Sequence, residues 1–387
     1  MPDPPAIWIL ALASALSPFG MIVIVPSLGE VASHYAVSPG DTQLLIATYL
    51  FGLGVGQPIS GHLADRTGRR PVILGGFLLF SAASLAGALC TSFVPLVGAR
   101  FLQAVGVSAG TVGARAIVRD THDALGAARA MGVIGAAMGM PPVIGPPIGG
   151  LLSDHWGPPA IFAFSAVLGG VTLLALWTSL AETLRRDSLP VSAPWYRQWR
   201  ELLGSRVFLG YTLLYAFTQS AFFVFLAVGA PLFAERFSID SGEFGVLWGI
   251  MGMLYVASAA ASGRLMRRFG PGQSLAGATL LTSIGGLTLA LLAFARVESA
   301  AAILLPLAAM MAAAGLQTAQ ALAGAVNCRP DIAGTAAGLS SATALGLCGL
   351  LTILSGLLYS GAFLPVAVLV AFCGVMSWAA ARLTRGA

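Results

Sequence analysis

The chain has 387 residues, of which 57% are hydrophobic and 9% are charged, and its mean hydropathy is +0.87. Soluble domains carry about 25% charged residues, so this composition excludes a soluble globular protein and indicates an integral membrane protein in a lipid bilayer. The net charge of +5 comes from 20 arginines scattered at segment ends, and without a basic stripe it predicts no nucleic-acid partner.

The residues that usually hold metals or perform catalysis are few and scattered. The four cysteines lack C-x-x-C spacing, and the four histidines stand at segment ends without an i, i+4 pair. We therefore expect no metal site, no disulfide framework and no cofactor. Residues 106–110 spell G-x-S-x-G, but they lie inside an apolar helix without a preceding strand, so they do not indicate a nucleophile elbow. The sequence predicts that the protein is not an enzyme.

The first half divides into six apolar segments, each near the ~20 residues that cross the ~30 Å hydrocarbon core of a bilayer. The first follows Asp3 instead of a basic region and is too long for a signal-peptide core, so we expect it to be retained as a span. Charges and Pro/Gly breaks place the six spans near residues 7–29, 41–62, 71–91, 94–118, 128–152 and 158–180.

A polar connection follows the sixth span and predicts a linker over residues 182–205. Within it, apolar residues from Trp195 to Leu203 recur at helical spacing, with Arg197 and Arg200 between them. This pattern favours a short helix lying in the plane of the lipid headgroups. A disordered linker is the alternative.

Six more apolar segments follow, so twelve spans are predicted and both termini fall on the same side of the membrane. They lie near residues 207–234, 242–262, 272–294, 299–322, 332–357 and 360–382. With this threading, seventeen arginines lie on one side, and two, Arg236 and Arg296, lie on the other. Because short loops rich in Lys and Arg stay inside, both termini are predicted to be cytoplasmic.

The two halves of the chain also repeat each other. Residues 263–270 (GRLMRRFG) stand between spans 8 and 9 at the place that residues 61–68 (GHLADRTG) hold between spans 2 and 3. A parallel six-span repeat, with a cavity between its halves, is typical of secondary transporters. We therefore predict an all-α protein of two pseudo-symmetric six-helix bundles, residues 1–181 and 206–387, joined by the linker 182–205.

The turn Gly61–Arg70, GHLADRTGRR, is the densest charge cluster in the first third of the chain. It resembles the cytoplasmic signature of the major facilitator superfamily, G-x-L-a-D-r-x-G-r-[KR]. The resemblance implies the major facilitator fold and a conformational latch, in which Asp65 faces a helix terminus of the C-terminal half and Arg69 pairs with an acid after span 4, where Asp120 stands. A carboxylate at a helix N-terminus contributes ~0.3–1 kcal/mol, so several such pairs would close one face reversibly. The alternative is a purely topological basic loop. The implied latch residues are Gly61, Asp65, Arg66, Gly68, Arg69, Arg70, Arg119 and Asp120.

Arg100 is predicted to lie inside a span, ~10 Å below the outer surface when 1.5 Å per residue is counted from Val94. A charge there costs ~2.5 to over 10 kcal/mol, so Arg100 should face a cavity or a partner. Residues 100–106, RFLQAVG, resemble the superfamily's span-4 motif R-x-x-Q-x-x-G, which implies a role in proton coupling or binding. An arginine does not release its proton, so coupling would run through a neighbour of Arg100: a water, the substrate's own charge, or Glu30 at the end of span 1. The alternative is a packing role, with Arg100 hydrogen-bonded to backbone carbonyls of span 1.

Span 5 contains a run of glycine and proline, Gly145-Pro146-Pro147-Ile148-Gly149-Gly150. It resembles the G-P-x-x-G-G end of a motif found in antiporter members of the superfamily. Proline removes helix hydrogen bonds and glycine permits close approach, so this helix should bend and pack tightly. Pro141 stands where the motif usually has glycine, and we expect it to alter the kink.

Residues 100–120 and 333–342 most resemble the bicyclomycin-resistance (Bcr/CflA) branch of the drug:proton antiporters. That branch often has an acid in span 1 shortly before a proline. Here residues 21–26, MIVIVP, contain none, and no Asp or Glu lies near the centre of any predicted span. The departure argues against coupling through a buried carboxylate.

Uncharged amides within the spans are the remaining candidates for a substrate or proton pathway. In lipid such a side chain is costly unless it pairs or meets water, so each either lines the pathway or joins helices. Phenylalanines around Gln219 would form an aromatic wall suited to amphipathic substrates. The candidate amides are Gln57, Gln103, Gln219, Gln317 and Gln320.

The sequence therefore leads to two hypotheses. The first is a monomeric exporter of small amphipathic drugs or metabolites in the bacterial inner membrane, working by alternating access in exchange for protons. The second is an importer or uniporter of one small metabolite on the same scaffold, which the missing span-1 acid favours.

Overall fold

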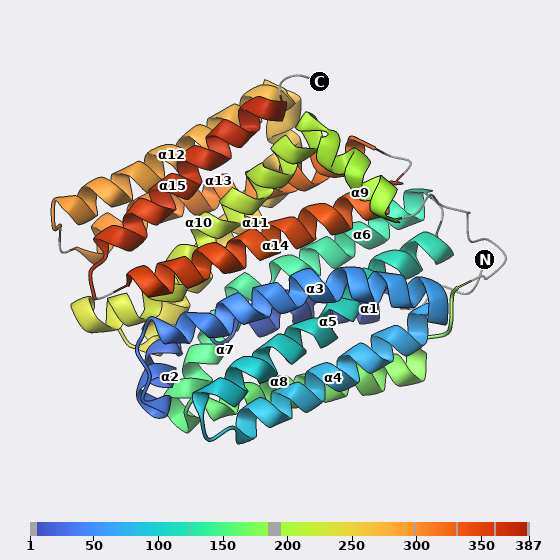
Figure 1. Cartoon of the computed structure of the whole chain (residues 1–387), viewed down its shortest axis with the longest axis horizontal. Helices are drawn as coiled ribbons and strands as arrows, with labels where there is room; N and C mark the ends of the chain where they lie inside the picture. The colour runs from blue at the N-terminus through green and yellow to red at the C-terminus, as the bar shows by residue number, and fades with distance from the viewer. Residues whose placement is uncertain are drawn as a thin grey trace. The chain divides into compact units, whose positions relative to one another are not determined.

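The computed structural model describes residues 6–122, 124–184, 195–297, 299–329, 332–359 and 361–384. Every regular element in these ranges is a helix (Figure 1). Eleven helices are long and apolar enough to cross a membrane, and the shorter apolar helix α1, Ile7–Ile22, precedes them. The prediction of an all-α, multi-pass membrane protein is confirmed.

The elements of the first half begin and end close to the predicted spans. They are α1 (Ile7–Ile22), α2 (Leu28–Tyr35), the 3-10 turn η1 (Asp41–Gln43), α3 (Leu44–Thr67), α4 (Arg69–Leu89), α5 (Phe93–Thr121), α6 (Ala124–Gly139), α7 (Pro141–Trp156) and α8 (Pro159–Ser179).

The second half begins with a short helix that is followed by six long ones. They are α9 (Trp195–Gly204), α10 (Arg206–Phe237), α11 (Ser241–Phe269), α12 (Pro271–Phe294), α13 (Ala300–Asn327), α14 (Ala333–Leu358) and α15 (Leu364–Leu383).

The chain forms two compact units. Unit 1 comprises Met1–Val37, Thr48–Val191 and Ser241–Gly249, and unit 2 comprises Ser38–Ala47, Ser192–Asp240 and Ile250–Ala387. The division into bundles 1–181 and 206–387 stays a prediction.

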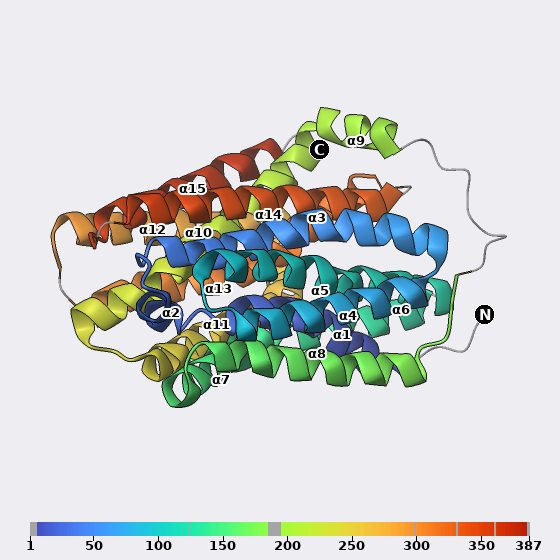
Figure 2. The same ribbon diagram turned by 60° about the horizontal axis from the view of Figure 1, so that its bottom comes forward.

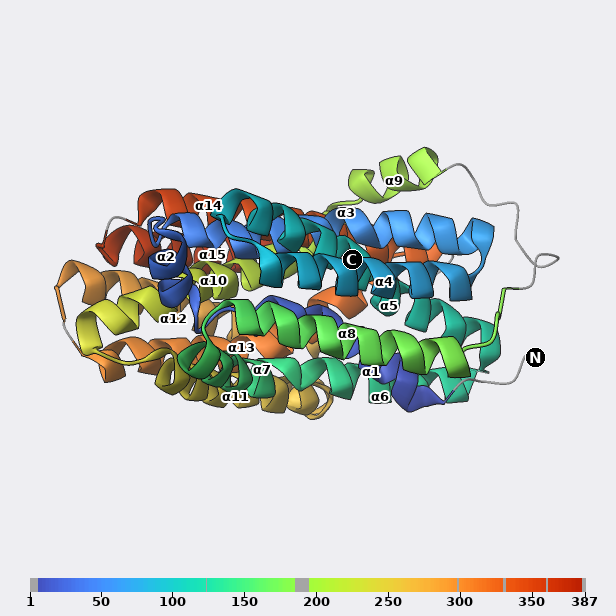
Figure 3. The same ribbon diagram turned by 90° about the horizontal axis from the view of Figure 1, so that it is seen from below.

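Small residues allow the helices of unit 1 to approach closely. α4 packs against α5 and α8, and Figure 3 shows α4 and α8 side by side. A Cβ atom added at Gly76 would lie 2.5 Å from the carbonyl oxygen of Gly106, and one added at Gly106 would lie 2.5 Å from that of Gly76. In a membrane the hydrophobic effect does not drive helices together, because lipid tails are as apolar as the side chains. Close packing of this kind stabilises the helix pair instead.

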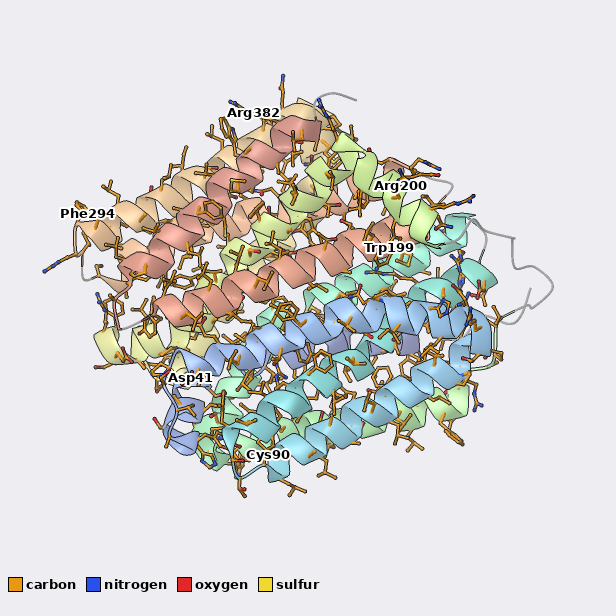
Figure 4. The ribbon with its side chains drawn as sticks, viewed as in Figure 1. Asp41, Cys90, Trp199, Arg200, Phe294 and Arg382 are labelled. Carbon is orange, nitrogen blue, oxygen red and sulfur yellow. The ribbon has the colours of Figure 1, made fainter. Side chains whose placement is uncertain are left out.

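In unit 2, α10 packs against α13, α14 and α15. The linker helix α9 lies across α10 and α14 (Figure 2). Leu202 of α9 is fully buried in a cluster with Phe208, Ala325, Ala336 and Leu339. The helical interpretation of this part of the linker is correct. However, its apolar side packs on the protein, while Arg200 is exposed (Figure 4).

Two predicted boundaries were wrong. The first span was expected over 7–29, but α1 ends at Ile22 and turns precede α2, because Pro26 disfavours a helical residue before it. The stretch Gly61–Arg70 was expected to be a turn, but α3 continues to Thr67 and α4 begins at Arg69. Polar residues can extend a helix beyond the hydrocarbon core, so hydropathy alone set this boundary too early.

Span 5 is divided at Pro141, ahead of the run Gly145–Gly150 to which the bend was assigned, and α7 continues through that run as one helix. α6 ends at Gly139, and α7 begins with Pro141 and Pro142. Proline suits the first turn of a helix but breaks the preceding hydrogen-bond ladder. The span therefore consists of two helical segments with Met140 between them.

Candidate functional site

Gly68 is the residue that separates α3 from α4, and its φ of +114° is a conformation that side chains disfavour. Gly270 separates α11 from α12 in the same way, with a φ of +78°. The two glycines occupy matching places in the predicted repeat, so the two halves share a positive φ at this position as well as a similar sequence.

Arg69 is the centre of the charge cluster at this junction. Its side chain is 3% exposed, and it donates from Nη1 to Asp65 Oδ1 at 2.5 Å and from Nε to Asp120 Oδ2 at 3.1 Å. Asp120 is therefore the acid after span 4 that the motif requires. Arg119 is 67% exposed and lies 3.8 Å from Asp120. Arg66 is exposed and Gly61 is half-buried.

Glu182 is a member of this cluster that the sequence analysis did not identify. Its carboxylate accepts hydrogen bonds from the backbone N–H groups of Arg69 at 2.9 Å and Arg70 at 3.1 Å. The N–H groups of Thr183 and Leu184 also donate to it, each at 2.9 Å. The first two are N–H groups of the first turn of α4, which have no partner within the helix. Glu182 therefore caps α4 from a distant part of the chain.

The electrostatics of Glu182 follow from this position. Partial burial raises the pKa of a carboxyl group, but the four backbone hydrogen bonds lower it by more, so the pKa of Glu182 lies below its ordinary value. Arg70 ties the same segment down, because Nε donates to Leu180 O at 2.7 Å and Nη2 donates to Trp177 O at 3.0 Å. The end of span 6 is thus joined to the start of span 3.

Arg100 lies on α5 and is 2% exposed. Its Nη1 donates to Gly20 O of α1 at 2.9 Å and to Gln103 Oε1 at 3.0 Å. The guanidinium carbon lies 4.3 Å from the ring centroid of Tyr49, within the range of a cation–π interaction. The bond to a span-1 carbonyl is the contact expected from the packing alternative.

Gln103 continues the same network. Its Nε2 donates to Ser84 Oγ of α4 at 2.7 Å, and Gln103 is 1% exposed. The network therefore joins α1, α4 and α5. Glu30 lies on α2, where the hydroxyl of Ser153 on α7 donates to its carboxylate.

The glycines of span 5 permit close contact with α1. A Cβ added at Gly149 would lie 1.7 Å from the carbonyl oxygen of Val23, and Gly145 faces Ile22. Gly150 is buried. Pro146 contacts another part of unit 1, because a Cβ at Gly245 would lie 2.6 Å from the Pro146 carbonyl oxygen. The motif therefore allows the backbone of α7 to approach the backbones at Val23 and at Gly245 closely.

The candidate amides of unit 2 differ in their surroundings. Gln317 is fully buried; it accepts from Thr218 Oγ1 at 2.7 Å and donates to Ala278 O at 2.8 Å and Thr282 Oγ1 at 2.5 Å. These bonds join α10, α12 and α13. Gln320 is 7% exposed and donates to Ser274 Oγ at 3.1 Å. Both contacts are those expected from amides that join helices.

Gln219 and Gln57 are more accessible, because each is half-buried. Gln219 Oε1 accepts a hydrogen bond from Thr318 Oγ1 at 3.1 Å. Thr318 was not identified from the sequence, since a threonine in an apolar helix gives no distinguishing signal.

No group of three or more His, Cys, Asp or Glu side chains that could hold a metal ion occurs among the described residues.

Known proteins match this chain over most of its length. The "Chloramphenicol resistance protein" of Pseudomonas aeruginosa is 33% identical over 295 residues, which cover 71% of this chain and 69% of that protein. The "Multidrug resistance protein D" of Escherichia coli (strain K12) is 28% identical over 381 residues, which cover 92% of this chain and 94% of that protein.

Solved structures and a family model agree with these relatives. The crystal structure of a D-xylose-proton symporter shares the fold with a TM-score of 0.80 at 14% identity, covering 98% of this chain and 96% of that one. A family model described as Major Facilitator Superfamily matches residues 10–353. Together with the two relatives, this match shows that the chain is a transporter and not an enzyme, and the chain belongs to this superfamily.

Proposed function

We propose that the protein exports small amphipathic drug-like molecules by alternating access in exchange for protons. The observation that carries this proposal is the 28% identity to "Multidrug resistance protein D" over 92% of the chain. The 33% identity to a "Chloramphenicol resistance protein" favours the same class of substrate. The resemblance to the Bcr/CflA branch belongs to this proposal.

The cluster around Arg69 suits the proposed latch. Its charges come from α3, α4 and α5, and the carboxylate of Asp65 is 56% exposed. An exposed carboxylate can exchange partners at low cost, because exposed ion pairs contribute only ~0–1 kcal/mol each. The approach of Asp65 to a helix terminus of the C-terminal half remains part of the proposal, as do the cytoplasmic termini, the bacterial inner membrane and the monomeric state.

The exporter and the alternative, an importer or uniporter of one small metabolite, differ in whether transport is coupled to protons. Arg100 is held by Gly20 and Gln103, and arginine side chains stay protonated in proteins. Proton exchange would therefore use another group, such as Glu30 beside Ser153. An importer or uniporter needs no such group.

Transport in proteoliposomes distinguishes the two hypotheses. We would measure uptake of a panel of drugs with and without an imposed pH gradient. Drug movement against its gradient, with protons moving in the opposite direction, is the expected result. Equilibration of a single solute independently of the pH gradient would replace the exporter with the uniporter.

A further inference from the structure

Along one side of α10 runs a strip of half-buried side chains that includes an amide and two hydroxyls, although most of this helix is buried. Tyr211, Tyr215, Gln219 and Phe222 are half-buried, whereas residues 216–218 and 220–221 are buried. The spacings of four, four and three residues place the four side chains on one side of the helix. We call Tyr211, Tyr215, Gln219 and Phe222 the α10 strip.

A polar cluster lies beside the strip. Thr318 of α13 donates to Gln219 Oε1 at 3.1 Å, and Tyr255 of α11 lies beside Thr318. The backbones approach closely here, because a Cβ at Gly315 would lie 2.1 Å from Tyr255 O. Three helices, α10, α11 and α13, thus bring three half-buried polar side chains together.

The cluster lies near the middle of the membrane-spanning segment. α10 has 32 residues, which corresponds to about 48 Å, and Gln219 lies about 20 Å from its start at Arg206. Binding sites of secondary transporters lie near the bilayer midplane. The depth of Gln219 is therefore suitable for a substrate contact.

The chemistry of the strip is unsuited to lipid. On α12, by contrast, the exposed residues from Leu280 onward are all apolar, among them Leu280, Leu287 and Leu291, which is the composition expected at a lipid-facing surface. An amide or hydroxyl moved into hydrocarbon without a partner costs several kcal/mol, on the order of 4–8. The side of unit 2 that presents Gln219, Thr318 and Tyr255 is therefore better suited to water or a solute.

We propose that Gln219, Thr318 and Tyr255, together with the aromatic rings of the α10 strip, bind uncharged aromatic solutes that carry hydrogen-bonding groups. This inference rests on the proposed export function and specifies its substrate class. Gln219 Nε2 makes no hydrogen bond to another described residue, so it is available to donate to a carbonyl or nitro oxygen. The cluster and strip contain no charged side chain. A cationic ligand would therefore meet no countercharge here.

The direct test uses chloramphenicol as the uncharged aromatic probe and tetraphenylphosphonium as the cationic one. Gln219→Leu should raise the KM for chloramphenicol export at least 10-fold, because the leucine cannot donate. Gln219→Glu should shift the ratio of cation to chloramphenicol export at least 10-fold toward the cation. Gln273→Leu is the matched control, since Gln273 is an exposed amide on α12 of the same unit, and it should leave both values unchanged.

Equilibrium binding to the purified protein separates this inference from the export proposal. Wild-type protein should bind chloramphenicol, and Gln219→Leu, Thr318→Val and Tyr255→Phe should each weaken binding, Gln219→Leu by at least 10-fold. If chloramphenicol binds in this pattern but is not exported, the export proposal fails and the site stands. If it does not bind, or binds equally well to all three variants, the site is overturned.

Discussion

At the scale of single residues, Glu182 shows how one carboxylate can join two distant segments. It accepts four backbone hydrogen bonds, two from the start of α4 and two from its own segment. The pKa of Glu182 is lowered in the folded protein. The stabilisation is therefore fully present above the ordinary pKa of glutamate and is lost as the pH falls through the lower folded pKa.

We predict that Glu182→Gln lowers the melting temperature of the purified transporter at neutral pH and removes part of the loss of stability in acid. The amide keeps an acceptor but loses the charge that favours a helix N-terminus. Thermal melts between pH 3 and pH 7 measure both effects. Glu201→Gln is the control, because Glu201 forms an exposed ion pair with Arg329. Parallel pH curves for wild type and Glu182→Gln would contradict this prediction.

For Arg100 we predict that Arg100→Lys impairs transport almost as much as Arg100→Ala, and that both variants lower stability. Lysine keeps the charge but cannot stack its planar group on Tyr49 while bonding Gly20 O and Gln103. A buried acceptor left without a partner costs about 1–3 kcal/mol. Transport rates and melting temperatures measured together test the prediction. If Arg100→Ala transported normally and melted at the wild-type temperature, Arg100 would contribute neither to transport nor to stability.

At the scale of elements, the helices of unit 1 are held together at points where only glycine fits. We predict that Gly149→Ala lowers stability and transport, because its Cβ would lie 1.7 Å from Val23 O. Gly132→Ala, in the first segment of the same span, would meet nothing within 4 Å. It should be neutral or slightly stabilising, since alanine is favoured over glycine in helices. Equal melting temperatures of the two variants would contradict the prediction, because they would mean that α7 and the end of α1 can move apart enough to accommodate the Cβ atom without loss of stability.

At the scale of the whole molecule, the proposed latch depends on charges from several spans. We predict that Asp65→Asn leaves membrane insertion and substrate affinity near the wild-type values but slows transport several-fold, because a latch charge changes the conformational equilibrium. The dissociation constant and the maximal rate, measured separately in proteoliposomes, distinguish these effects. A normal rate at every substrate concentration would remove the latch role from this loop.

The extent to which the sequence predicted the structure differs from feature to feature. Arg69 and Asp120 were paired correctly, because the motif fixes both residue types and the helices that carry them. The burial of Arg100 followed from the cost of a charge in lipid, and the packing alternative placed its partner among the carbonyls of span 1. Which carbonyl it binds could not be predicted, because a backbone oxygen such as Gly20 O has no sequence signature. Glu182 was missed for a similar reason. Its four donors are N–H groups, which every residue except proline possesses.

The turns at Gly68 and Gly270 share a backbone conformation but differ in what surrounds them. A Cβ at Gly68 would lie 2.4 Å from the Glu182 carboxylate, whereas one at Gly270 would meet nothing within 4 Å, and nor would one at its neighbour Gly272. The turn of the second half therefore has open space where the turn of the first half is filled by a carboxylate. A cysteine introduced at Gly272 should therefore carry a fluorescent reporter without disturbing the fold. A labelled cysteine at the matching position of the first half, Arg70, should disturb the structure, because Arg70 donates hydrogen bonds to Leu180 O and Trp177 O.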